Sequence, residues 1–117
     1  MIRATGTVGT AHDAQRGGVM SWATPYLPKL AQGEPVTFRP RGHSMEPLIS
    51  SGQEVTVEPI GDEAIQPGDV VLCHVRGQHY LHLVKAVQGE RYLIGNNRGR
   101  INGWVTRRAI HGRWIRR

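Results

Sequence analysis

Short apolar runs separated by glycine- or proline-containing turns fill the chain from residue 35 onward. Val36 and Phe38 alternate with polar neighbours, and Val55 and Val57 do the same further along. This two-residue period places every second side chain on one face of a strand. The run DVVLCHV is apolar almost throughout, which is typical of an internal strand. The pattern predicts a mainly β domain of short antiparallel strands, of the sandwich or barrel kind.

The first part of the chain does not continue this pattern. Residues 1–18 are rich in Gly, Ala and Thr without apolar periodicity, so we expect a flexible N-terminal arm. Pro25 and Pro28 limit the apolar segment that follows to a short helical turn or an extended stretch packed on the domain. A chain of 117 residues suits one folded domain, which we place at residues 19–117.

Positive charge is concentrated in the last quarter of the chain. The net charge is +6, yet all nine Asp and Glu lie within residues 1–90, and residues 91–117 contain eight arginines. Such a segment either forms a solvated basic surface or docks a polyanion. A non-catalytic β domain that binds nucleic acid or an acidic protein partner is therefore one alternative function.

Other classes of protein and site are disfavoured by the composition. The single cysteine, Cys73, cannot form an internal disulfide, and its apolar run indicates a small buried hydrophobe. No apolar stretch approaches the ~18 residues that span a bilayer, and no signal-peptide core occurs, so we expect a soluble, cytoplasmic protein without a membrane span. His79 and His82 point to opposite faces of their strand, and we expect no metal site and no cofactor.

The segment GHSMEPLI places a serine in a turn between two predicted strands. A serine hydroxyl attacks a carbonyl at neutral pH when a base lies within hydrogen-bond reach and amide groups hold the developing oxyanion. Gly42 allows an unusual backbone conformation before Ser44, and Pro47 stiffens the turn after it. His43 is the nearest candidate base, but adjacent side chains in an extended turn project apart. The base therefore has to come from elsewhere in the chain.

Four blocks, in order, resemble the superfamily of type I signal peptidases and LexA/UmuD-type serine peptidases. GHSMEPLI is similar to the family's Gly-x-Ser-Met-x-Pro box and supplies Ser44. IQPGDVV is similar to its Gly-Asp-Ile-Val strand, and YLHLVKAV to the strand that carries a Lys or His base. YLIGNNRGRINGWV stands where the family has Gly-Asp-Asn and a return strand. The resemblance covers roughly residues 35–115 and implies a β-rich signal-peptidase/LexA-like fold.

The resemblance implies a serine endopeptidase in which Ser44 attacks a peptide carbonyl and His82 accepts its proton. His82 aligns with the family's base, 38 positions after Ser44, and a histidine with an ordinary pKa is neutral enough to act. Lys85 is the alternative base, and it would need a strongly lowered pKa. Strand alternation places His82 and Ala86 on one face, and Lys85 and Val87 on the other, so only one base can face the serine.

The resemblance also assigns the surroundings of the serine. The Ser44 amide, with that of Met45 beside it and Gly42 shaping the turn, would hold the oxyanion. His43, Met45 and Leu48 would line the cleft as a pocket for small substrate side chains.

An acid that follows the Gly-Asp-Asn turn in some branches of the superfamily is missing from this chain. Asn97 is therefore the candidate for orienting His82. The substrate would be a peptide or protein, cut during processing, or the chain itself in self-cleavage. A UmuD-like regulatory subunit, clipped once in its arm and acting as a homodimer, is a further alternative.

Overall fold

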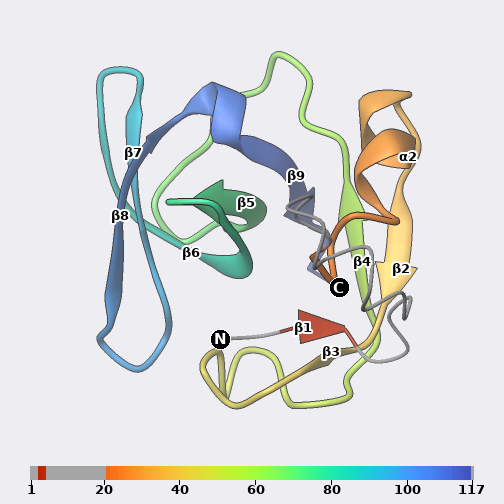
Figure 1. Ribbon diagram of the computed structural model, residues 1–117. Helices are drawn as coiled ribbons and strands as arrows, with labels where there is room; N and C mark the ends of the chain where they lie inside the picture. The colour runs from red at the N-terminus through yellow and green to blue at the C-terminus, as the bar shows by residue number, and fades with distance from the viewer. Residues whose placement is uncertain (1–2, 5–20, 117) are drawn as a thin grey trace.

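The computed structural model describes residues 3–4 and 21–116, and it confirms the prediction of a mainly β chain of short antiparallel strands (Figure 1). Seven strands form one antiparallel sheet in the order β2-β4-β9-β5-β6-β7-β8. They are β2 (Val36–Phe38), β4 (Val55–Glu58), β5 (Val70–Val75), β6 (Gln78–Gln88), β7 (Arg91–Gly95), β8 (Ile101–Thr106) and β9 (Ile110–Trp114). A short 3-10 helix, η1 (Arg107–Ala109), leads into β9. The last strand in sequence therefore lies inside the sheet, between β4 and β5.

Apolar side chains are buried in two clusters. In β4 the buried Val55 and Val57 alternate with half-buried polar residues, as the sequence pattern predicts. β5 is buried at nearly every position because it lies between β9 and β6 and packs on both faces. Leu72 belongs to one cluster and Cys73 to the other. Cys73 is fully buried, which confirms the prediction of a small buried hydrophobe, and burial raises the pKa of its thiol to about 12.

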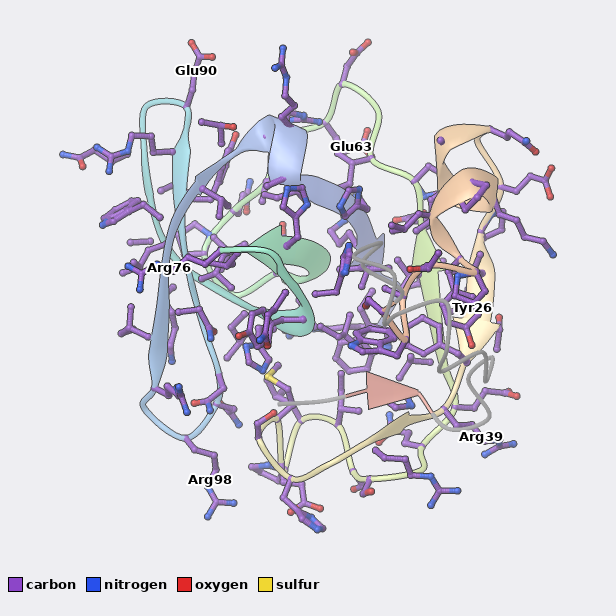
Figure 2. The ribbon with its side chains drawn as sticks, in the orientation of Figure 1. Tyr26, Arg39, Glu63, Arg76, Glu90 and Arg98 are labelled. Atoms are coloured by element: carbon purple, nitrogen blue, oxygen red, sulfur yellow. The ribbon has the colours of Figure 1, made fainter. Side chains whose placement is uncertain are left out.

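A short helix, α2 (Leu27–Ala31), lies beside β2 at one end of the sheet (Figure 1). Pro28 sits in its first turn, where a proline removes no helical hydrogen bond. Figure 2 shows Tyr26 next to β2, where its ring stacks on Phe38 with centroids 4.8 Å apart. Trp22 packs on the same ring with centroids 5.6 Å apart. Through these aromatic contacts, the segment before β2 covers the buried cluster that contains Phe38.

A separate two-stranded sheet pairs β1 (Arg3–Ala4) with β3 (Pro40–Arg41), just before the serine turn. Residues 5–20, which include most of the predicted arm, lie outside the described residues, so the flexibility of that arm and the boundary at residue 19 stay predictions. Within residues 3–4 and 21–116, no helix is long and apolar enough to cross a membrane.

Strand β6 changes register at Lys85. Val84 and Ala86 pair with successive residues of β7, so Lys85 is an extra residue in the ladder. This bulge brings Val87 onto the face that Val84 occupies and turns Ala86 to the opposite face. The alternation predicted for Ala86 and Val87 was therefore wrong, because a two-residue period persists only while the ladder is unbroken.

Candidate active site

Ser44 lies in a compact turn between β3 and β4 that the core holds in place. The side chains of Met45 and Ile49 are fully buried, and the Ile49 amide donates to the Met45 carbonyl at 3.1 Å. Gly42 has a φ of 122°, a conformation that favours glycine, and its amide donates to Ser51 Oγ at 3.1 Å. The turn is thus anchored on both sides of Ser44, which is only 8% exposed.

The side chains of Ser44 and His82 meet in the structure. Ser44 Oγ lies 3.3 Å from His82 Nε2, although the two residues are 38 positions apart. On the other side of the ring, His82 Nδ1 lies 2.8 Å from Asn102 Oδ1. His82 belongs to β6 and Asn102 to β8, so the sheet places both side chains against the serine turn. A hydroxyl, a base and a group that orients the base are thereby joined in one chain of contacts.

The surroundings of His82 keep its ring neutral and oriented. An amide oxygen only accepts hydrogen bonds, so Asn102 Oδ1 assigns the ring proton to Nδ1 and leaves the Nε2 lone pair toward Ser44. Burial lowers the pKa of His82 to about 4, against the opposing effect of the Asn102 hydrogen bond. Tyr80 stacks on the imidazole with centroids 4.8 Å apart. At neutral pH the ring can therefore take a proton from the serine.

Lys85 occupies a different environment. It is the half-buried extra residue of the β6 bulge, and among the described residues no hydrogen bond joins it to Ser44. Its Cγ lies 3.1 Å from the point that a Cβ on Gly95 would take, so its side chain passes over β7. The geometry therefore pairs Ser44 with His82.

Asn97 does not contact the ring nitrogens of His82, so the prediction that Asn97 orients this base was wrong. Its backbone N–H donates to the Ser44 carbonyl at 2.9 Å, and its Nδ2 donates to the Glu46 carbonyl at 3.0 Å. Asn97 thus fastens the β7–β8 turn to the serine turn. Asn102 takes the orienting place, and no local sequence pattern marks it, because strand pairing brings β8 to His82.

Of the residues predicted to line a substrate pocket, Met45 was wrong, because its side chain is fully buried in the core. Leu48 is half-buried and packs against the same cluster, and its place in a pocket stays a prediction, as does that of His43. The His43 ring is largely exposed, and its Nδ1 lies 3.0 Å from a carboxylate oxygen of Glu46. Met45, next to Ser44 in sequence, therefore anchors the serine turn in the core.

A cleft of about 240 Å³ opens beside His82. Its walls come from β6, β8 and the turn between β7 and β8, and every lining residue carries a polar group. The lining residues are Gln78, Tyr80, His82, Asn96, Arg100 and Asn102. The side chain of Asn96 is itself fixed, because its Oδ1 accepts from the Arg98 and Arg100 amides at 2.8 and 2.9 Å. The cleft therefore presents amide, hydroxyl and guanidinium groups, with those of Asn96 and Arg100 coming from the β7–β8 turn.

Two neighbouring amides of the serine turn differ from that of Gly42 in their hydrogen bonding. Among the described residues, no hydrogen-bond acceptor lies on the N–H of Ser44 or of Met45, whereas the Gly42 amide is bound to Ser51. Consecutive amides of this kind can hold an oxyanion together. Gly42 contributes the shape of the turn and not a free donor.

The sequence of this chain is similar to that of one known protein family. A family model described as Peptidase S24-like matches residues 3–113, which is nearly the whole chain. A search of curated proteins finds no match. The matched segment contains the serine turn, β6 with His82 and β8 with Asn102. The chain therefore belongs to the Peptidase S24-like family.

Proposed function

We propose that this protein is a serine endopeptidase with Ser44 as nucleophile and His82 as general base. The observation that carries the proposal is the continuous contact from Ser44 Oγ through His82 to Asn102, at 3.3 and 2.8 Å. Membership of the Peptidase S24-like family supports it independently. A buried neutral histidine next to a serine hydroxyl is an arrangement that can activate the serine for nucleophilic acyl transfer.

The reaction follows from these contacts. Ser44 Oγ attacks the scissile carbonyl carbon while His82 Nε2 takes the hydroxyl proton, and the amides of Ser44 and Met45 hold the resulting oxyanion. The imidazolium then gives its proton to the leaving amine, which releases the first product and leaves an acyl-enzyme. Water attacks the ester with His82 again as base, which frees the second product and restores Ser44.

Asn102 limits how far the protein stabilises the charged form of His82. Its amide oxygen accepts the Nδ1 proton and fixes the ring, but it carries no formal charge to balance an imidazolium. Burial further disfavours that imidazolium, as the low pKa of His82 shows. We expect slow turnover, which suits an enzyme that makes one or a few cuts in a chosen partner.

The polar cleft supports a substrate class. Arg100 is exposed at its rim, and Asn96, Gln78 and Tyr80 supply further hydrogen-bonding groups. A peptide with a polar or acidic side chain near the scissile bond complements this lining better than an apolar one. We propose such a peptide segment as the substrate.

The test uses a peptide library cut by the wild-type protein and by three single variants, with products read by mass spectrometry. Ser44→Ala and His82→Ala should each lower cleavage by more than about a thousandfold, whereas Lys85→Ala should retain it. Self-cleavage is followed in the same samples from the mass of the protein. No cutting by the wild type, or loss of cutting in Lys85→Ala alone, would contradict the proposal.

Binding of nucleic acid or an acidic partner through residues 91–117 stays a prediction. Part of this basic segment is engaged within the fold: Arg113 lies within 3.5–3.6 Å of carboxylate oxygens of Glu58, Glu63 and Asp69. Arg107 donates to the carbonyl groups of Gly61 and Glu63. A homodimer and a regulatory role also stay predictions.

A further inference from the structure

Three histidines from three strands converge on the side of the β5–β6 ribbon away from His82. His74 on β5 is the direct cross-strand partner of His79 on β6. His111 on β9 joins them because β9 pairs with the other edge of β5. One ring nitrogen from each histidine lies within 4.8 Å of the other two. The three rings lie with their centroids 5.0 to 5.8 Å apart.

The polar contacts within this His74/His79/His111 cluster are incomplete. His74 Nδ1 lies 2.9 Å from His111 Nε2. His79 Nδ1 is buried, and among the described residues it has no hydrogen-bond partner. A buried ring nitrogen without a partner is uncommon, because most such groups bond to protein or to an ordered ligand. His79 Nδ1 therefore carries a lone pair or a proton for which the described residues provide no hydrogen-bond partner.

We propose that His74, His79 and His111 form a binding site for a divalent transition-metal ion, with Zn²⁺ as the ion that fits best. Imidazole nitrogen is a preferred ligand of Zn²⁺, and three histidines with an open fourth position are a known ligand set for it. A tetrahedral site with Zn–N bonds near 2.0–2.1 Å has ligand nitrogens about 3.3 Å apart. The cluster reaches this spacing with small side-chain rotations, since its nitrogens already lie within 4.8 Å.

The cluster is open enough for an ion to reach its three imidazole rings. All three side chains are only half-buried, so an ion can enter and a water molecule can complete its coordination.

The proposed site is separate from the peptidase dyad. His79 and His82 lie on the same strand, but their side chains occupy opposite faces, with His82 toward Ser44. A bound ion would join β5, β6 and β9 without touching Ser44. Metal binding should therefore be equal in wild type and in Ser44→Ala, whether or not the protein cuts peptides.

The test measures Zn²⁺ affinity of the tag-free chain by competition with a chromophoric chelator. The wild type should bind one equivalent, and His79→Gln and His111→Gln should each bind about 100-fold more weakly. His43→Gln is the matched control, because His43 is an exposed histidine outside the cluster, and it should bind as the wild type does. No stoichiometric binding by the wild type, or an equal loss in His43→Gln, would overturn the proposal.

A second measurement needs no variant and so does not depend on how the substitutions affect folding. Imidazole nitrogen resonances of the wild-type protein are recorded as Zn²⁺ is added, and then again with excess chelator. The signals of His74, His79 and His111 should move together and return with the chelator, while those of His43 and His82 stay. Movement of His82, or of His43, in place of the three would contradict the assignment.

Discussion

Burial of the His82 ring sets the acid limit of the reaction proposed for Ser44. The pKa of His82 is lowered to about 4, so the ring stays neutral and able to accept a proton down to that pH. We expect kcat/KM to rise from acid pH with a midpoint near 4, well below the ordinary histidine value of about 6.5. The measurement is a pH profile, with circular dichroism at each pH to confirm folding. A rise that continues above pH 8 would instead indicate a lysine base.

Asn102 offers a graded test at the same ring. Asn102→Asp keeps the hydrogen bond to Nδ1 and adds a charge, so it should raise the pKa of His82 and shift the acid midpoint upward. Asn102→Leu removes the acceptor and should lower kcat by about tenfold or more with the fold retained. Kinetics of both variants across pH check this. An unchanged acid midpoint in Asn102→Asp would show that residue 102 does not act through the ring.

Sequence reasoning reached two residues of this site but not the third. Ser44 and His82 stand in local patterns that can be recognised in one chain: a Gly-x-Ser-Met-x-Pro turn for Ser44, and a strand in which an aromatic residue precedes His82 and apolar residues follow it. Asn102 is defined by cross-strand register, and the β7–β8 ladder has an irregularity between Ile94 and Gly95. Counting along the sequence from GNN therefore could not place it.

At the scale of secondary-structure elements, the β7–β8 turn is fastened to the turn that carries Ser44. Asn97 ties the β7–β8 turn to the serine turn through two hydrogen bonds, to the carbonyls of Ser44 and Glu46. Asn97→Asp keeps the size but loses the side-chain donor, so we expect kcat to fall by about tenfold with little change in KM, because misplacement costs rate. Arg98→Ala is the control, since Figure 2 shows the Arg98 side chain pointing outward from the β7–β8 turn.

The acid midpoint separates the roles of the two asparagines. A residue that positions the serine turn leaves the pKa of His82 alone, so Asn97→Asp should keep the wild-type midpoint. A shifted midpoint would mean that Asn97 acts on the base and not on the turn.

Close packing of β9 against β4 depends on Gly112. A Cβ at Gly112 would lie 2.6 Å from Val57 Cγ1 and 2.8 Å from the Glu58 carbonyl oxygen, both closer than atoms can pack. Gly112→Ala should lower the free energy of unfolding by about 1–3 kcal/mol, the cost of overpacking a core. Urea denaturation measures this, with Gly61→Ala as control because its added Cβ meets only the flexible Glu63 carboxylate. Equal stability of the two variants would contradict the expectation.

The strands themselves were largely predictable, because period-two apolar runs and glycine turns are local signals. The bulge at Lys85 was not, since it is visible only in how β6 pairs with β7. The same holds for the His74/His79/His111 cluster, whose members are brought together by pairing between β5, β6 and β9. The expectation of no metal site came from the spacing of His79 and His82 along one strand. Such spacing carries no information about histidines on neighbouring strands.

At the scale of the whole molecule, three buried or half-buried histidines make stability depend on pH. The pKa values of His79, His82 and His111 are all lowered in the fold, to about 4 for the last two. Below about pH 6.5, these three histidines therefore bind protons in the unfolded chain but stay neutral in the folded chain. Their stabilising contribution is complete above pH 6.5 and is lost as the pH falls to 4.

We expect the urea midpoint of unfolding, measured in the presence of a chelator, to decrease between pH 6.5 and 4. His111→Gln should flatten that decrease, whereas His43→Gln, at an exposed position, should not. A urea midpoint that is constant over this range would contradict the lowered pKa values.

The place of β9 has a consequence for protein synthesis. β4 and β5 do not pair with each other, and each pairs with β9, which follows both in the chain. Ser44 precedes β4 and His82 lies on β6, so β9 joins the part of the sheet next to Ser44 to the part that carries His82. During synthesis we therefore expect the sheet between these two residues to be completed only after β9 has been made.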